Sequence, residues 1–378
     1  MKILKMPKLV VLSFIIFSGL VWPVIRCQLK YIGPAKALPM PKLKRNLLLI
    51  KEDCGQVCDT SDNFVKKSGL YFDKIVKDIN CEYLFDSPLL DDNKDVIEQQ
   101  LQESGEIKPP SKQNVPEDIL EMYSYDGRIE IYSTYMDDFK WTAEEHEEEN
   151  SLMWSKDVID EYRKEHRSGK MYGAYGVPSV QNITKNLQEH MHDQVKNGHV
   201  LVMGSQTPWI EAILLELGAA KITTLEYAKI ETDHEQINVL TPEEFRQAYI
   251  KGQLPLFDAM VTYSSLEHSG LGRYGDSLNP WGDLITMAKA WCVMKPKGRA
   301  LVGVPSGLDK VIFNTNKNYG RIMNSHLFAN WDVVHSEFQE LKVDTPGFDI
   351  RVFCNDDSVF WCYQPITVVE KPKIQTEL

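Results

Sequence analysis

Blocks of apolar and polar positions alternate along the second half of the chain, and each block has the length of a strand or a helix. The run from His199 to Met203 is apolar after its first residue, which is typical of a strand buried on both faces of a parallel sheet. Residues 209–217 then carry apolar side chains at helical spacing, and Gly218 follows them. Thr207 and Pro208 predict the N-cap and the first turn of that helix.

The same alternation continues to the end of the sequence. Further strands are predicted at 221–225, 236–240, 257–263 and 300–304, helices from Thr241-Pro242 and Asn279-Pro280, and closing antiparallel strands near 331–338 and 350–363. Strands that alternate with helices are typical of a parallel sheet covered by helices. We therefore predict an α/β fold, with a Rossmann-like, mostly parallel sheet and flanking helices, over residues 173–370.

The N-terminal part has a different pattern. Three lysines within the first eight residues precede the mostly apolar segment Leu9–Ile25, about 17 residues long and at the lower limit of a spanning helix. We predict an uncleaved signal anchor over residues 1–30, with a cleaved signal peptide as the alternative. Residues 31–51 contain several Pro and Lys and are predicted to form a stem. Residues 52–172 are predicted to be a mixed N-terminal region.

An uncleaved anchor would make the protein a single-pass membrane protein of the secretory pathway, in the ER or Golgi lumen, and a cleaved one a secreted protein. Two features agree with that location. Asn182 begins an Asn-Ile-Thr sequon, which predicts a glycoprotein. Cys54, Cys58 and Cys81 lie in a polar stretch, and two of them could pair in an oxidising compartment.

Composition and charge exclude some functions. The chain has 378 residues, of which 43% are apolar and 25% charged, as in a globular protein. Lys and Arg number 42 and Asp and Glu 54, giving a net charge of −12, and no nucleic-acid partner is expected because a phosphate backbone requires a basic face. The seven cysteines are irregularly spaced, and His190 and His192 would lie on different helix faces. We therefore predict no metal site.

The first predicted strand, turn, helix and second strand have the arrangement of a nucleotide-binding half. Gly204 would allow a ligand to approach the backbone, with Ser205 beside it, and Glu226 would accept hydrogen bonds from two ribose hydroxyls. Glu226 follows Gly204 by 226 − 204 = 22 residues, near the usual spacing. The single glycine disfavours NAD or FAD, because their pyrophosphate needs further glycines to approach the backbone closely. It does not disfavour S-adenosylmethionine, which has no phosphate. Alternatively, Gly204 only turns the chain and Glu226 is a solvated strand end.

The loop from Ser264 to Asp276 follows the fourth predicted strand and should lie over the pocket, because ligands bind at the carboxyl ends of such strands. His268 is a candidate general base, and Glu267 could orient it or face the cofactor. Arg273 could hold an anionic substrate group or pair with Asp276. The alternative is a structural loop in which His268 caps a turn.

The stretch from Val200 to Pro305 resembles class I S-adenosylmethionine-dependent methyltransferases at Leu225-Glu226, Phe257–Val261, Leu266–His268 and Lys295–Gly298. More closely, Gly204–Trp209, Ser265–Asp276 and Asn279–Leu284 resemble domain-of-unknown-function family 268, which is rich in nematode members, and the likeness runs from about Asp53 to Tyr363.

This resemblance implies a methyltransferase-like domain with S-adenosylmethionine as its cofactor. We predict that Gly204, Ser205, Glu226 and Ser264 bind the cofactor. His268 and Glu267 are the predicted catalytic residues, and the predicted substrate contacts are Arg273, Tyr274, Asp276 and Asn314.

One segment departs from the family pattern Asn-x-His-Arg-x-Tyr-Gly. It spans Asn314 to Gly320, with Asn316 and Lys317 at the His and Arg positions. If the His is a base, this chain lacks it. If the His only bridges to a substrate hydroxyl, Asn316 can do the same.

Three functions remain open. The first is an O-methyltransferase acting on an unknown lumenal acceptor, such as a glycan hydroxyl. The second is a catalytically silent Rossmann-like binding protein of the secretory pathway, which the degenerate glycine loop and Asn316 favour. The third is a glycosyltransferase, which the anchor and stem suggest. Against it, the sequence shows no Asp-x-Asp motif for the metal that a nucleotide sugar needs.

Overall fold

The computed structural model describes residues 79–86, 115, 120, 122–125, 127–133, 152–274, 276, 278–307, 309–337 and 364–373, and the backbone of three two-residue strands before them. The predicted anchor and stem, apart from those strands, lie outside the described residues, as do Cys54 and Cys58. Within the described part of the chain, no helix is both long and apolar enough to cross a bilayer. The domain boundaries and the anchor stay predictions.

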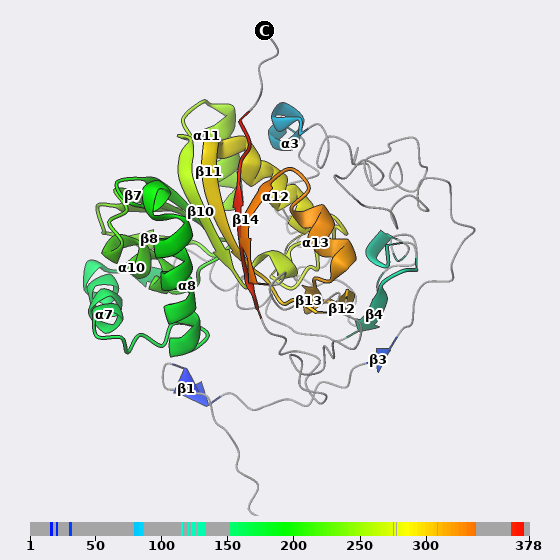
Figure 1. Ribbon diagram of the computed structural model, residues 1–378, viewed down its shortest axis with the longest axis horizontal. Helices are drawn as coiled ribbons and strands as arrows, with labels where there is room; N and C mark the ends of the chain where they lie inside the picture. Colours follow the sequence, from blue (N-terminus) through cyan, green and yellow to red (C-terminus); the bar gives the residue numbers. More distant parts are fainter. Residues whose placement is uncertain are drawn as a thin grey trace, which may run out of the picture.

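A seven-stranded sheet forms the centre of the fold (Figure 1). In chain order its strands are β6 (His199–Met203), β7 (Lys221–Leu225), β9 (Ile237–Leu240), β10 (Phe257–Tyr263), β11 (Met294–Gly303), β14 (Asp332–Ser336) and β15 (Ile366–Glu370). Their order across the sheet is β14-β15-β11-β10-β6-β7-β9. The five strands from β11 to β9 are parallel, and β15 pairs antiparallel with both β11 and β14.

Helices cover both faces of this sheet, and Figure 1 shows α7, α8 and α10 on one side and α12 and α13 on the other. The helices are α3 (Cys81–Asp86), α7 (Lys156–Arg167), α8 (Val177–His190), α9 (His192–Val195), α10 (Trp209–Glu216), α11 (Pro242–Ile250), α12 (Gly282–Val293) and α13 (Arg321–Leu327), with the 3-10 turn η4 (Leu266–His268).

The strand β6 shows why its sequence reads as a continuous apolar run. Val200 and Val202 pack into the core cluster beneath α7, α8 and α10, whereas Leu201 and Met203 pack into the cluster with α11 and α12. Side chains alternate between the faces of a strand, so a strand covered on both faces needs apolar residues at every position.

Shorter strands form smaller sheets. One has the order β13-β12-β4-β3, with β13 (Asn316–Asn318), β12 (Lys310–Phe313), β4 (Glu130–Ser133) and β3 (Lys30–Tyr31). A second pairs β5 (Leu152–Trp154) with β8 (Ile230–Thr232), and a third pairs β1 (Ile16–Phe17) with β2 (Leu20–Val21). The hairpin of β12 and β13 lies beside η4.

The bounds of β6, β7 and β10 match the prediction, and the capping box of Thr241 and Glu244 confirms the predicted start of α11. The predicted starts of the helices α10 and α12 were wrong. In each, a tight turn precedes the helix: the Thr207 carbonyl accepts from the Trp209 N–H, and the Asn279 carbonyl from the Gly282 N–H.

The predicted closing edge is partly confirmed. β14 lies where a strand was expected, but its antiparallel partner is β15, and the predicted strand 350–363 falls outside the described residues. The expected turn 295–298 belongs to the first half of β11, where the pairing with β10 shifts register and Lys297 has a φ of 68°.

A disulfide ties α3 to the α/β part of the chain. Cys81 is bonded to Cys292 in α12, across a separation of 211 residues. The ring of Phe85 also stacks on Tyr249 of α11 at 3.7 Å, and Arg246 donates to the Phe85 carbonyl. Cys81 was expected among pairing cysteines, but Cys292 was not, because it lies in the apolar sequence of a buried helix.

Candidate functional site

The predicted cofactor residues come together at the carboxyl ends of the parallel strands. Gly204 and Ser205 follow β6, Glu226 follows β7, and Ser264 follows β10. Since β6 lies between β7 and β10, these ends are neighbours in the sheet. This is the edge where ligands bind in open α/β sheets.

Gly204 approaches another part of the protein rather than open space. Its φ is +77°, a conformation that glycine adopts without strain. A Cβ at this position would lie 2.0 Å from Oγ of Ser265 and 2.5 Å from its Cβ. The space over the glycine, which the sequence assigned to a ligand, is therefore filled by Ser265.

Glu226 links the ends of β6 and β7. Its Oε2 accepts from the Ser205 N–H at 2.7 Å, and its Oε1 accepts from the Tyr227 N–H at 2.8 Å. Burial raises the pKa of this carboxyl group, and the N–H groups of Ser205, Tyr227 and Ala228 partly offset that shift. A carboxylate has about four acceptor positions, more than the three N–H groups occupy, so Glu226 retains the capacity to accept a hydrogen bond from a ribose.

Glu211 lies beneath the same loop and was not singled out by the sequence. It is fully buried in α10 and accepts from the hydroxyl of Ser205 at 3.0 Å and that of Thr224 at 2.7 Å. Burial raises its pKa to about 7. A glutamate in the first turn of an apolar helix is the available sequence signal, but such residues usually face water.

Ser264 and Glu267 form the polar centre of the loop after β10. Ser264 has a φ of 54°, which is unusual for a residue with a side chain. Its hydroxyl donates to Oε1 of Glu267 at 2.7 Å and accepts from Gln364 at 3.0 Å. Glu267 is 1% exposed, and burial raises its pKa to about 7. Among the described residues, its Oε2 has no hydrogen-bond partner.

His268 is held in one tautomer. Its Nδ1 lies 2.6 Å from the carbonyl oxygen of Thr315, which can only accept, so Nδ1 carries the hydrogen and Nε2 is unprotonated. Nε2 lies 3.7 Å from Oε1 of Glu267. Burial and the nearby guanidinium of Arg273 lower the pKa of His268 to about 3. The imidazole is therefore neutral at physiological pH.

The four residues predicted to contact substrate separate into two groups. Arg273 donates to the Thr315 carbonyl at 3.3 Å, and its guanidinium lies 5.0 Å from the centre of the Tyr274 ring, so both residues border His268. Asp276 is buried and accepts from the N–H groups of Gly270 and Tyr274, which is the contact set of a residue that fixes a loop. Asn314 is buried in the turn between β12 and β13.

A buried charged cluster supports that hairpin. Nζ of Lys317 donates to Oδ1 of Asp283 at 2.5 Å and to the carbonyl of Pro280, and the Tyr319 hydroxyl donates to Oδ2 of Asp283 at 2.8 Å. Asn316, at the position of the family's histidine, donates its amide to Asn318 inside the hairpin. Lys317 therefore has a structural role that the sequence did not indicate.

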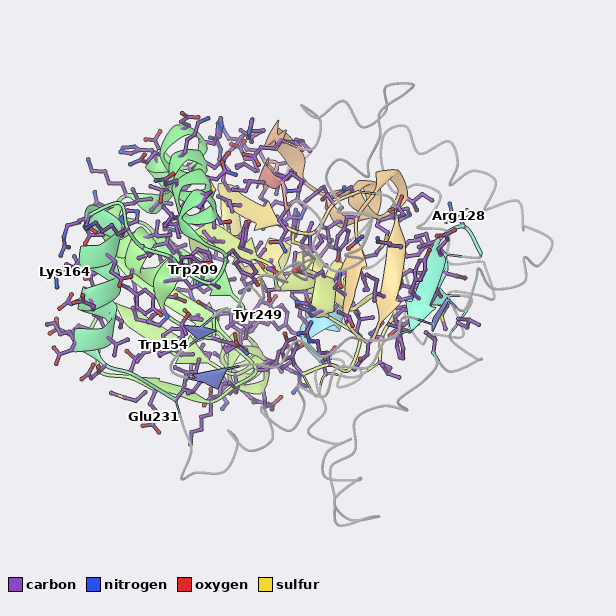
Figure 2. The ribbon with its side chains drawn as sticks, turned by 90° about the horizontal axis from the view of Figure 1, so that it is seen from below. Arg128, Trp154, Lys164, Trp209, Glu231 and Tyr249 are labelled. Atoms are coloured by element: carbon purple, nitrogen blue, oxygen red, sulfur yellow. A yellow bond between two sulfur atoms is a disulfide. The ribbon has the colours of Figure 1, made fainter. Side chains whose placement is uncertain are left out.

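An aromatic cluster adjoins Ser264. The Tyr175 ring lies 5.4 Å from that of Tyr263 and 6.3 Å from that of Trp209, which Figure 2 labels. Tyr175 is 38% exposed, and its hydroxyl lies beside Ser264. Burial and the carboxyl group of Glu267 raise its pKa to about 12. Tyr175 was not among the predicted site residues, because it precedes the first strand of the sheet by more than 20 residues.

Asn182 lies in the middle of α8, away from these residues in the chain. Its Nδ2, the atom to which a glycan would be attached, donates to Glu337 at 3.2 Å, and Glu337 also accepts from Asn186 and from the N–H of Ile366. A glycan on Asn182 would compete for this space. Glycosylation stays a prediction.

In the part of the chain that the structure describes, no group of three or more His, Cys, Asp or Glu side chains could hold a metal ion. His190 and His192 belong to different helices, α8 and α9.

A family of proteins described as "Caenorhabditis protein of unknown function, DUF268" matches residues 196–351 of the chain. The match confirms the resemblance found in the sequence over these residues, which include β6, β7, β10 and the loop that follows it. A search among functionally curated proteins finds no match.

Three solved structures are similar to parts of the chain. An S-adenosylmethionine-dependent methyltransferase from Mesorhizobium loti is 11% identical, over 51% of this chain and 96% of that one, with a TM-score of 0.32. TehB from Haemophilus influenzae is 11% identical over 56% and 67%, with a TM-score of 0.34. A hemolysin candidate from Streptococcus thermophilus is 10% identical over 53% and 67%, also with a TM-score of 0.34.

Proposed function

We propose that the domain whose residues 196–351 match this family of unknown function is an S-adenosylmethionine-dependent methyltransferase. The observation that carries the proposal is the strand order. Numbered in chain order, the strands run 3-2-1-4-5-7-6 across the sheet, with the seventh strand antiparallel. This order is the topology of the class I methyltransferases that the sequence resembles.

The residues at the strand ends fit this cofactor in two places. Glu226 stands at the end of β7 with lone pairs available for ribose hydroxyls, and the Glu267 carboxylate has one oxygen without a partner among the described residues. The glycine loop fits less well, because Ser265 fills the space over Gly204. The fit therefore requires the Ser265 side chain to turn away. When bound, the cofactor would supply an electrophilic methyl group.

The acid–base role belongs to Glu267 better than to His268. A hydroxyl that accepts a methyl group must lose its proton, and a general base works best when its pKa is near the working pH. Burial holds the pKa of Glu267 at about 7 and that of His268 at about 3. His268, oriented by the Thr315 carbonyl, would accept a hydrogen bond from the acceptor through Nε2, while Glu267 takes the proton.

The disulfide carries the proposal for the compartment, and the compartment carries the proposal for the acceptor. Disulfides persist in oxidising compartments, and the bond between Cys81 and Cys292 favours the secretory pathway. We propose a hydroxyl of a lumenal glycan as the acceptor, since glycans carry many such hydroxyls there. Either an anchored or a secreted form is compatible with this proposal.

A second candidate function is a catalytically silent binding domain. The observation that favours it is the contact between Gly204 and Ser265, which closes the glycine loop onto the protein itself. In this case the fold would be retained without the cofactor.

Calorimetric titration of the full chain with S-adenosylmethionine separates the two functions. The methyltransferase proposal expects saturable binding that Glu226→Ala weakens about tenfold to a hundredfold, because a hydrogen bond to a charged acceptor contributes about 1.5–3 kcal/mol. Glu231→Gln, at an exposed residue labelled in Figure 2, is the matched control and should bind as the wild type does. A folded wild-type protein that does not bind the cofactor would leave only the silent domain.

A further inference from the structure

The Glu267 carboxylate is bonded on one side only. Oε1 accepts from the Ser264 hydroxyl at 2.7 Å, whereas Oε2 is closed to solvent and has no hydrogen-bond partner among the described residues. A buried carboxylate oxygen without a partner is costly, and native proteins usually supply one. A positively charged ligand group would supply such a partner.

The groups that face Glu267 do not supply a cation in contact with Oε2. His268 is neutral, with its Nε2 at 3.7 Å from Oε1. Tyr175 and Tyr319 are neutral phenols whose pKa values are raised. The Arg273 guanidinium lowers the pKa of Glu267 through space, but its Nη1 is directed at the Thr315 carbonyl. Burial outweighs this attraction, because the net shift of the Glu267 pKa is upward.

We propose that Oε2 of Glu267 is the counter-ion for the positively charged group of a ligand bound at the ends of β6 and β10. This inference rests on the proposed function. S-adenosylmethionine carries a sulfonium charge, whereas its product S-adenosylhomocysteine has a neutral thioether at the same place. Glu267 would therefore select the charged cofactor over the neutral product and favour product release.

The charges balance through the reaction. Glu267 would lose its proton to solvent when it holds the sulfonium. The cofactor would supply a methyl group to the acceptor oxygen as the carbon–sulfur bond breaks, and the Glu267 carboxylate would take the acceptor proton. The site thus loses the sulfonium charge and the carboxylate charge together. Because Oε2 is closed to solvent, the ligand must displace a neighbouring side chain to reach it.

The test is calorimetry of the full chain with S-adenosylmethionine and, separately, S-adenosylhomocysteine, each in two buffers of different ionisation enthalpy. At pH 7, near the Glu267 pKa, the charged ligand should release about half a proton per molecule bound and the neutral product none. The charged ligand should bind about tenfold to a hundredfold more tightly. Lowering the pH to 5 should remove most of this preference, because Glu267 is then protonated.

Glu267→Gln keeps the shape of the side chain and removes its charge. It should abolish the proton release and most of the preference, whereas the control Glu231→Gln should change neither. The wild-type comparison of two ligands needs no variant, so it decides the question even if Glu267→Gln is unstable. Equal affinity for both ligands without proton release would overturn the proposed counter-ion role of Glu267 and would not contradict the proposed methyltransferase function. Binding of neither ligand would overturn both.

Discussion

Glu267 and His268 are adjacent in the sequence, and burial moves their pKa values in opposite directions. The pKa of the carboxyl group rises to about 7 and the pKa of the imidazole falls to about 3, because burial disfavours the charged form of each. Pairs of titratable groups with separated pKa values define acid–base roles in enzymes. Sequence alone favours histidine as the candidate base, and only the fold shows that the glutamate is the more deeply buried of the two.

At Gly204 a single missing side chain permits a contact between two loops. We expect Gly204→Ala to lower the free energy of unfolding by about 1–3 kcal/mol, because its Cβ would overlap Ser265 and its φ is positive. Urea denaturation of the purified variant measures the loss.

The double variant Gly204→Ala, Ser265→Gly serves as its control. Removing the Ser265 side chain leaves only the backbone strain, so the double variant should recover part of the lost stability. A double variant no more stable than Gly204→Ala would show that the contact with Ser265 does not determine the choice of glycine.

The hairpin of β12 and β13 is an element that depends on residues far away in the chain. β13 consists of Asn316, Lys317 and Asn318, three polar residues that are all buried. Its position is fixed by the bonds of Lys317 and Tyr319 to Asp283 at the start of α12. The hairpin places the Thr315 carbonyl against His268 and Arg273, so this buried cluster orients the candidate site.

Lys317→Met should destabilise the protein by about 3–5 kcal/mol, because it leaves Asp283 buried without its cation. The measurement is chemical denaturation followed by circular dichroism.

Adding Asp283→Asn to Lys317→Met should restore much of the stability, since an amide can still accept from the Tyr319 hydroxyl. If the single variant were as stable as the wild type, the buried ion pair would contribute nothing to the hairpin.

The elements that sequence predicts well are those whose pattern is local. β6 is a short apolar run, β7 and β10 are rich in β-branched and apolar residues, and α11 begins with a local capping box, so each could be predicted with little context. The strand β13 could not, because the charge of its central residue, Lys317, is balanced by Asp283, more than thirty positions earlier in the chain. In the site, the strand ends bring Gly204, Glu226 and Ser264 together as expected, but Glu211 and Tyr175 lie on segments without a recognisable motif.

The whole molecule carries buried acids whose ionisation opposes folding. Glu211 is fully buried with a pKa of about 7, against 4.5 for an ordinary glutamate. Its folded-state pKa is raised, so its contribution to stability is complete below pH 4.5 and is lost as pH rises through 7.

Glu211→Gln removes this titration from the unfolding equilibrium. The stability of the variant relative to the wild type should therefore rise by up to about 3 kcal/mol between pH 4.5 and pH 8, at about 1.4 kcal/mol for each unit of pKa shift. Denaturation curves at several pH values measure it, with the exposed Glu231→Gln as a control. A difference that does not change with pH would mean that Glu211 does not titrate in this range.

The position of β15 has a consequence for the order in which the protein can be assembled during synthesis. β15 lies between β11 and β14 and pairs with both, although it is the last of the three to leave the ribosome. Until β15 has emerged, β14 has no neighbour in the main sheet and the edge of β11 is uncovered. Uncovered strand edges attract other chains. The nascent protein should therefore need protection by chaperones at this stage, and a ribosome stalled before residue 366 should display a sheet that ends at β11.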